Sequence, residues 1–297
     1  MTTQAWLLSD TPASAWQAKC GRWFRVWLRT LQSPAMLFGL AILLLMVLGA
    51  LLAPWLAPTD PNAQDINRRL MAPGAEHWLG TDQLGRDLLS RVIYGTRPTL
   101  LIVTLVAVLS APLGLAVGIC AGYFGGWVSA LLMRITDVFM AFPRLVLALA
   151  LVAVLGPGIV NAVIAIAITA WPPYARIART ETLTTKASDF LQAAHVQGLP
   201  TSRILLGHLL PVCLPSTVIR VTLDMAGIIL TAAGLGFLGL GAQPPMSEWG
   251  AMIAAGRQFI FDQWWVAAVP GVAILLGSLA FNLVGDGLRD VLDPRNG

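Results

Sequence analysis

Long apolar segments alternate with polar segments along this sequence. The first apolar segment runs from residue 36 to residue 56 without a charged side chain. At 1.5 Å per residue, a helix of that length spans about 30 Å, which is the thickness of the hydrocarbon core of a bilayer. The pattern therefore predicts an all-α, polytopic membrane protein with six transmembrane helices. The other five segments are about 100–120, 138–155, 159–174, 212–240 and 264–284.

Two long polar stretches, 58–99 and 175–210, interrupt the apolar pattern. The second half of the first stretch predicts an amphipathic helix, capped by Thr81 or Asp82, that lies along the membrane interface or on a partner. Its apolar face would carry Leu84, Leu88, Leu89, Val92 and Ile93.

Shorter polar features lie near the third and fourth apolar segments. Residues 133–137 predict a polar break before the third segment, and Arg144 is expected to extend from that segment to the headgroups. The pair Pro172-Pro173 is expected to end the fourth segment, because proline disrupts a helix interior.

The composition strengthens the membrane interpretation. Hydrophobic residues make up 57% of the chain and charged residues only 11%, whereas a soluble domain has about 25% charged residues. This balance excludes an ordinary soluble enzyme, a disordered protein and a disulfide-rich scaffold. The 19 lysines and arginines do not cluster, so nucleic acid is not an expected partner. The three cysteines, Cys20, Cys120 and Cys213, lie too far apart to predict a disulfide framework or a zinc site.

Motifs for enzyme chemistry are absent from the sequence. It contains no HExxH zinc motif, no GxSxG nucleophile elbow and no GxxxxGK[ST] phosphate-binding loop. We therefore expect no catalytic residue, no metal site and no cofactor bound by this chain. Energy for any transport must come from a partner or from an ion gradient.

The distribution of positive charge predicts the orientation. With six helices, twelve lysines and arginines fall on the side of both termini and six on the other side, so both termini are expected in the cytoplasm. The chain then divides into a cytoplasmic tail (1–35), a first transmembrane helix with an external loop (36–96), a core of five helices (97–286) and a second cytoplasmic tail (287–297). The core contains the cytoplasmic loop 175–210.

Residues 189–211, called the coupling segment below, predict a short helix, a break at Gly198-Leu199-Pro200, and a second helix capped by Thr201 or Ser202. Gly198 allows the backbone to turn at the corner. Small side chains at Ala193 and Ala194 would let another protein approach closely. Such a segment is a candidate docking lever, although its spacing also suits an amphipathic loop with no partner.

The coupling segment resembles the EAA loop of type I ABC importer permeases. Ala193, Ala194, Gly198, Leu210 and Pro211 match that pattern in register. The sequence departs from it at Gln192, where the family usually has Glu, and at His208, where Ile is usual.

Three other segments resemble one branch of that family, the shorter permease of dipeptide, oligopeptide and nickel importers. The first is the sequence LGTDQLGRD at 79–87, and the second runs from 125 to 143 but lacks the acid usually found near Ser129. The third begins at FLGLGAQPP, 237–245, and continues through 281–294. The ordered set covers most of residues 36–294.

The resemblance implies a transport subunit of the bacterial inner membrane with the type I ABC importer permease fold. Its partners would be a second, longer permease, two ATPase subunits that use ATP-Mg and receive the coupling segment, and an external substrate-binding protein. Small peptides are the leading cargo, with nickel or a metal chelate as the alternative. An ion-coupled secondary transporter is the alternative from another class. External docking candidates are Thr81, Asp82, Arg86, Asp87, Glu248 and Trp249.

Asp224 is a charged residue inside the fifth apolar segment, where an isolated carboxylate is costly. Arg220 lies one helical turn earlier and could pair with it. Alternatively, Asp224 lines the translocation pathway and meets a cationic group of the cargo. Both residues are therefore pathway candidates.

Overall fold

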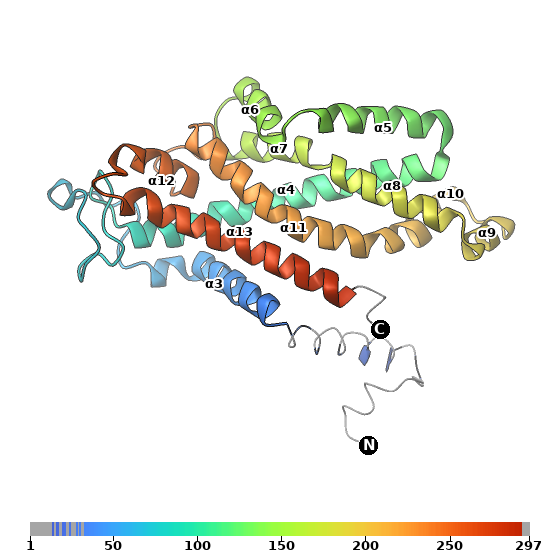
Figure 1. The fold of residues 1–297 in the computed structure, drawn as a ribbon, viewed down its shortest axis with the longest axis horizontal. Coiled ribbons are helices and arrows are strands. Elements are labelled where there is room, and N and C mark those ends of the chain that lie inside the picture. The colour runs from blue at the N-terminus through green and yellow to red at the C-terminus, as the bar shows by residue number, and fades with distance from the viewer. Residues whose placement is uncertain are drawn as a thin grey trace, which may run out of the picture.

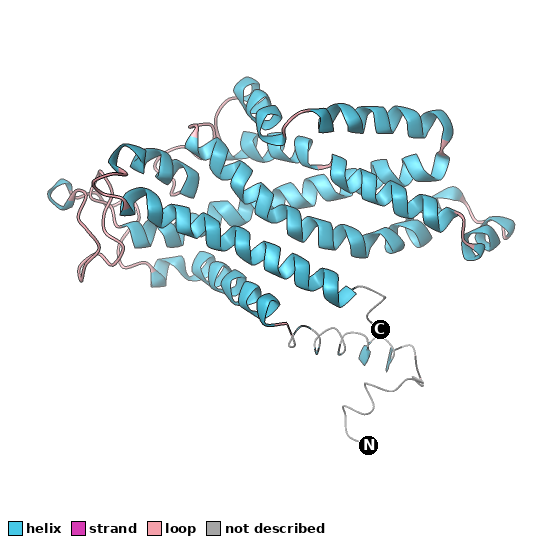
Figure 2. Ribbon diagram, viewed as in Figure 1, coloured by secondary structure: helices cyan, strands magenta, loops and turns pink. Residues whose placement is uncertain are grey.

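The computed structural model describes residues 33–292 and, before them, residues 14, 16, 17, 20, 21, 24, 28 and 30. The basic positions Lys19, Arg22, Arg25 and Arg29 of the predicted tail, together with residues 293–297, lie outside the described part. Within that part the chain is helical and contains no β-strand (Figure 2).

Four apolar segments form long helices that confirm the sequence prediction. They are α3 (Pro34–Leu56), α4 (Leu88–Phe124), α11 (Leu210–Phe237) and α13 (Trp265–Leu292). Each is long and apolar enough to cross a bilayer, and α11 is extended by the turns that precede it. The helices run along the long axis of the molecule (Figure 1).

Helix α4 is longer than predicted because the expected amphipathic helix and the second apolar segment are one element. The helix begins at Leu88, where the Asp87 side chain accepts a hydrogen bond from the Ser90 amide. Thr81 and Asp82 precede it in a turn, so neither caps a helix, which corrects the prediction. The Asp87 carboxylate satisfies an amide of the first turn that has no hydrogen-bond partner within the helix.

The third apolar segment is a bent pair of helices, α5 (Gly126–Ala141) and α6 (Arg144–Leu155), with 91° between them. Residues 133–137 lie inside α5, so the predicted polar break is wrong. Their polar side chains fit a helix because Asp137 is exposed and pairs with Arg176 at 2.7 Å. The bend falls at Phe142-Pro143 instead.

The fourth apolar segment forms α7 (Ile159–Ala170), and α8 (Pro172–Lys186) follows after the single residue Trp171. Helix α7 thus ends directly before Pro172-Pro173, close to the predicted end, and a second helix begins there. These prolines occupy the first turn of α8, where proline costs little because the amide would have no acceptor within the helix. Trp171 itself keeps helical backbone angles.

Helices α4 and α8 pack closely because α4 presents glycines to α8. A Cβ atom on Gly114 would lie 2.6 Å from the Trp171 carbonyl oxygen, and one on Gly118 would lie 2.3 Å from the Ala175 carbonyl oxygen. Contacts this short do not occur between real atoms, so only glycine permits this approach.

Two apolar cores fill the described bundle. The larger core joins α3, α4, α6, α7, α11, α12 (Trp249–Gly256) and α13. The smaller core lies near α9 (Asp189–Val196) and joins it to α4, α8 and α11. Figure 1 shows α12 and α9 at opposite ends of the molecule, which are called the α12 end and the α9 end below.

Candidate functional site

The coupling segment forms a helix, a corner and a second helix at the α9 end, as its sequence predicted. Helix α9 is followed by Gly198 at φ +73°, a left-handed conformation that glycine adopts without strain. Helix α10 (Thr201–Ile204) then continues through a π-helical turn, Leu205–Leu209, into α11. Pro200 precedes α10 and no side chain caps it, so the capping role predicted for Thr201 or Ser202 is wrong.

The small core holds the coupling segment against the bundle. Leu191 of α9 and Ile204 of α10 are fully buried together with Leu209. They pack with Ile119 of α4 and Ala178 of α8. The segment is therefore packed against α4, α8 and α11 and is not a free loop.

Two ring contacts fix α9 further. His195 stacks on Tyr123 at the end of α4, with ring centroids 5.9 Å apart, and the Lys186 ammonium donates a 2.6 Å hydrogen bond to the Tyr123 carbonyl. His208 stacks on Phe190 at 6.4 Å. This contact gives His208 a role that the EAA pattern did not suggest.

One face of α9 is left open to a partner. Gln192, Ala193 and Val196 are exposed, and Val196 has 89% of its surface accessible. Ala194 is buried against the bundle, so only Ala193 of the two alanines lies on the open face. The face of α9 that carries Gln192, Ala193 and Val196 is therefore exposed to the surroundings of the bundle.

The remaining coupling candidates lie where the segment joins α11. Leu210 is partly buried and Pro211 is exposed in the first turn of that helix. Proline is tolerated there because the preceding π-helical turn already changes the hydrogen-bond pattern.

Asp224 lies in the middle of α11 and binds two groups from other helices. It accepts hydrogen bonds from Arg144 Nη1 of α6 and from the Tyr174 hydroxyl of α8, both at 2.8 Å. The expected pairing with Arg220 is wrong, because both carboxylate oxygens are occupied by residues 80 and 50 positions away in sequence. Arg144 therefore pairs with Asp224, which corrects the expectation that it extends to the headgroups.

At the α12 end, charged residues of the 79–87 motif form a buried turn. Asp82 accepts hydrogen bonds from the Leu84 and Arg86 amides, and its other oxygen lies 2.7 Å from Arg86 Nε. Arg91, from the first turn of α4, donates to the Pro61 carbonyl at 2.9 Å. These contacts hold the external loop against the start of α4.

Asp87 connects the same turn to the helix and to the preceding loop. Its carboxylate accepts from the Ser90 amide and hydroxyl at 2.7 and 2.8 Å, and His77 Nδ1 lies 2.9 Å from the other oxygen. Thr81 is fully buried beside it and pairs with Asp87 through the backbone.

Glu248 and Trp249 anchor α12 inside the bundle. The Glu248 carboxylate accepts from the amides of Gly250 and Ala251, each at 2.8 Å, and so caps α12. Burial raises the pKa of this carboxyl, and the two amide hydrogen bonds oppose that shift. The Trp249 indole donates to the Val92 carbonyl at 3.1 Å.

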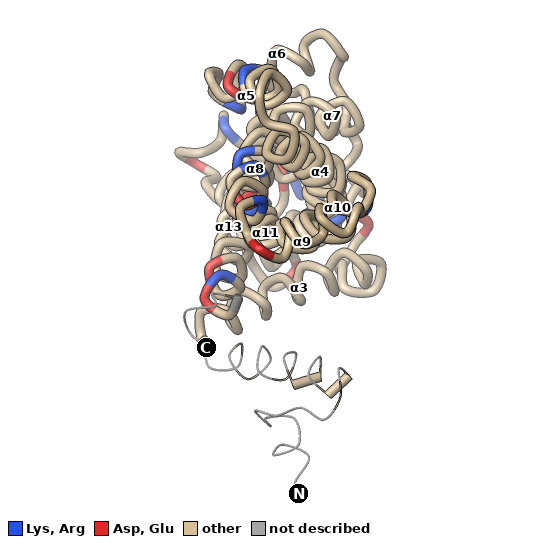
Figure 3. Tube along the Cα trace, turned by 90° about the vertical axis from the view of Figure 1, so that its right-hand side faces the viewer, with Lys and Arg blue, Asp and Glu red and all other residues tan. Residues whose placement is uncertain are grey.

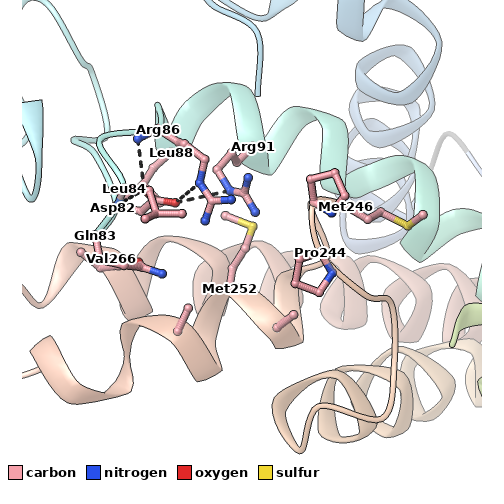
Figure 4. Close-up of a pocket in the computed structure, with 13 residues that line it drawn as sticks. Asp82, Gln83, Leu84, Arg86, Leu88, Arg91, Pro244, Met246, Met252 and Val266 are labelled. Atoms are coloured by element: carbon pink, nitrogen blue, oxygen red, sulfur yellow. Dashed lines mark hydrogen bonds and ion pairs between the residues drawn. The ribbon is translucent and has the colours of Figure 1, made fainter. Parts of the chain in front are cut away.

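A cavity of 220 Å³ separates the buried turn from α12 (Figure 4). Arg86 and Arg91 line it from the side of α4, whereas Met252 lines it from α12. Every external docking candidate has at most 9% of its surface exposed. Met246, which lines the same cavity, is 46% exposed. The candidates themselves are Thr81, Asp82, Arg86, Asp87, Glu248 and Trp249.

Sequence reasoning missed several residues that shape these sites. Local sequence gives no signal for the contacts of these residues, because their partners are distant in sequence or differ from the EAA pattern. They are Arg144, Tyr174, Tyr123 and Phe190. Across the described part of the chain, no group of three His, Cys, Asp or Glu side chains is arranged to hold a metal ion.

Comparison with known families gives a match over most of the chain. The family described as "Binding-protein-dependent transport system inner membrane component" matches residues 114–297. The N-terminal TM domain of oligopeptide transport permease C matches residues 21–73.

Several curated relatives are similar over nearly their whole length. The probable D,D-dipeptide transport system permease protein DdpC of Escherichia coli K12 is 45% identical, over 89% of each chain. The di/tripeptide permease DppC of Pseudomonas aeruginosa is 46% identical, covering 86% of this chain and 87% of the relative. The nickel permease NikC of E. coli K12 is 43% identical, covering 86% and 92%.

A solved structure supports the fold. The chain resembles one from the inward-facing MetNI methionine ABC transporter with a TM-score of 0.54 and 19% identity, over 68% of this chain and 97% of that chain. The protein is thus a multi-pass membrane permease. Its matched domains and its relatives together place the chain in the family of inner membrane permeases of ABC importers, in the branch of dipeptide, oligopeptide and nickel permeases.

Proposed function

We propose that this chain is the transmembrane permease subunit of an ATP-driven importer that moves small peptides across the inner membrane by alternating access. The observation that carries the proposal is the position of α9 in the coupling segment. One face of α9 is exposed, and the other packs against α4, α8 and α11. Such an element can transmit motion from a partner into the bundle. The peptide cargo follows from the names of the similar permeases DdpC and DppC.

The assembly that we propose has two ATPase subunits, which hydrolyse ATP-Mg, beneath this permease and a second, longer one. The open face of α9, with Gln192 and Ala193, would lie in a groove of one ATPase. A substrate-binding protein would dock at the α12 end, on the loop that the buried Asp82–Arg86 turn supports. This chain itself would bind no cofactor.

We propose six transmembrane spans, with both termini in the cytoplasm. Four are α3, α4, α11 and α13, and the bent pair α5–α6 is a fifth. The sixth would be α7 with the first turn of α8, and the rest of α8 would belong to the cytoplasmic loop 175–210. The tails (1–35 and 287–297), the first span with its loop (36–96) and the core (97–286) would keep the division that the sequence predicts.

Asp224 would lie on the translocation pathway, where exchange of its partners Arg144 and Tyr174 would accompany the change of state. Arg220, one helical turn nearer the α9 end of α11, would flank this pathway from a groove on the bundle. Nickel or a metal chelate remains the second candidate cargo, because NikC is nearly as similar as the peptide permeases. Because the chain belongs to the family of ABC importer permeases, we propose this class instead of an ion-coupled secondary transporter.

Substitution of Gly198 tests the coupling role. Valine is strained at φ +73°, whereas asparagine tolerates left-handed backbone, and no atom lies within 4 Å of a Cβ atom at this position. In the reconstituted four-subunit complex with its binding protein, we expect Gly198→Val to abolish ATP-driven peptide uptake and Gly198→Asn to retain most of it. Both variants should insert into the membrane equally well.

The measurement is uptake of labelled dipeptide into proteoliposomes, with ATP hydrolysis followed in parallel. Equal uptake by the Val and wild-type complexes would reject the coupling role. Normal assembly and coupling with no dipeptide uptake, but with uptake of nickel, would move the assignment to the second cargo.

A further inference from the structure

A groove with two arginines lies on the bundle toward the α9 end, apart from the coupling segment. It has a volume of 250 Å³ and lies between α8, α11 and α13. Figure 3 looks onto this end and shows charged positions on these helices. The lining residues are Ile177, Ser216, Ile219, Arg220, Leu223 and Arg289.

Both arginines lack an acidic partner within the described part of the chain. No ion pair involves Arg220 or Arg289, and Arg220 Nε is buried without a hydrogen-bond acceptor. Of the nearby acids, Glu181 accepts a hydrogen bond from Ser216 through one oxygen, and its other oxygen is buried without a partner. Asp286 and Asp290 are exposed to solvent. The groove therefore holds two positive charges with no counter-charge in contact.

With the spans that we propose, Arg289 would lie at the depth of the lipid headgroups and Arg220 slightly deeper. Arg289 follows Trp265 by 24 residues of α13, or about 36 Å, which exceeds the ~30 Å of hydrocarbon. Arg220 precedes Phe237 by 17 residues of α11, or about 25 Å, and its long side chain can extend to the same level.

The rest of the lining is apolar and continues onto an exposed apolar surface. Ile177, Ile219 and Leu223 line the groove, and Val212, one turn of α11 before Ser216, is 41% exposed on the same side of the helix. A ligand with an anionic head and an apolar tail fits both parts of this site.

We propose that the groove binds an anionic phospholipid, whose phosphate accepts hydrogen bonds from Arg220 and Arg289 while an acyl chain lies along α11. Guanidinium groups donate paired hydrogen bonds to phosphate, and basic pockets between membrane helices attract such headgroups. The site is distinct from the coupling segment and from Asp224, so it does not depend on the proposed cargo.

The test is native mass spectrometry of the intact transporter complex, released from nanodiscs that contain equal amounts of phosphatidylglycerol and phosphatidylcholine. We expect the wild type to retain phosphatidylglycerol preferentially. In the variant Arg220→Gln/Arg289→Gln, retention should fall about 30-fold, which corresponds to about 1 kcal/mol for each lost charge. Arg220→Lys/Arg289→Lys should restore most of it.

The matched control is Arg69→Gln/Arg134→Gln, which removes two exposed arginines elsewhere and should leave retention near the wild-type level. Equal retention by the groove variant and this control would overturn the proposal. If the groove variant does not assemble, photoactivatable phosphatidylglycerol on the wild type decides the question. Crosslinks in 214–223 or 286–292 would support the site. Crosslinks only elsewhere would overturn it, as would an acidic segment of the second permease bound to both arginines.

Discussion

At the scale of single residues, Ser129 is a neutral side chain that serves as the hydrogen-bond partner of a charged one. This buried serine of α5 accepts a 3.1 Å hydrogen bond from Arg179 Nε of α8. In this contact between α5 and α8, the Arg179 guanidinium is therefore paired with a neutral hydroxyl. A second contact, between Asp137 and Arg176, is exposed and contributes little.

Ser129→Asp should stabilise the protein by about 1 kcal/mol, because a hydrogen bond to a charged acceptor is stronger than one to a hydroxyl. We expect the Tm of the purified complex to rise by about 2–4 °C. Ser129→Asn is the matched control, since it has the same shape without the charge, and it should leave the Tm unchanged. A lower Tm for the Asp variant than for the Asn variant would mean that desolvation outweighs the new ion pair.

At the scale of elements, α12 is inserted into the bundle through positions that lack side chains. A Cβ atom on Gly250 would lie 2.1 Å from the Ala233 carbonyl oxygen of α11, and one on Gly236 would lie 2.0 Å from the Glu248 carboxylate. The close approach lets Glu248 and Trp249 reach their partners. The position of α12 therefore depends on these glycines.

Gly250→Ala should destabilise the protein by more than about 2 kcal/mol, because α12 must move away from α11 to admit the methyl group. Gly271→Ala, in α13, is the control, since no atom lies within 4 Å of its added Cβ. That change should be neutral or slightly stabilising. Unfolding of the purified complex by heat or denaturant measures both, and equal stabilities for the two variants would contradict the packing argument.

The sequence predicts elements well where the signal is local. The apolar lengths of α3, α4, α11 and α13 depend only on neighbouring residues, as does the helical shape around Gly198. The signal fails at α5, whose polar face is stabilised by α8, and it does not show that a second helix begins at Pro172, directly after α7 ends. Local patterning cannot distinguish these cases, because the partner that decides each one is supplied by the fold.

The same limit explains the errors at the candidate site. Arg220 was the natural partner for Asp224 because it lies four residues away, whereas Arg144 reaches Asp224 only through the 91° bend between α5 and α6. Charged residues such as Asp82 and Arg86 resemble a docking surface in sequence, but they satisfy one another inside a turn. Charge alone does not distinguish a contact surface from a buried network.

At the scale of the whole molecule, a polar layer separates the two apolar cores. On α11, Asp224 lies between Cys213 of the small core and Ala226 of the large core. On the α7–α8 pair, Tyr174 lies between Ala170 and Ala178 in the same way. The contacts of Asp224 with Arg144 and Tyr174 therefore join helices at the boundary between the two cores.

Arg144→Gln and Asp224→Asn should each lower the free energy of unfolding by about 2–3 kcal/mol, because each leaves a partly buried charge without its partner. The double variant should cost less than the sum of the two, by at least about 1 kcal/mol. The control cycle uses Arg176→Gln and Asp137→Asn, whose side chains are half exposed and should couple by less than about 1 kcal/mol. Additive effects in the Arg144–Asp224 cycle would show that this pair does not stabilise the fold.

The attachment of α9 has a mechanical consequence. Close-packed side chains resist compression, so a push on Val196 moves α9 and the adjoining parts of α4, α8 and α11 as one stiff block. Deformation must then concentrate where contacts can be exchanged without opening a void. The layer of hydrogen-bonded side chains around Asp224 meets that condition, and we expect the two halves of the bundle to slide past each other along it.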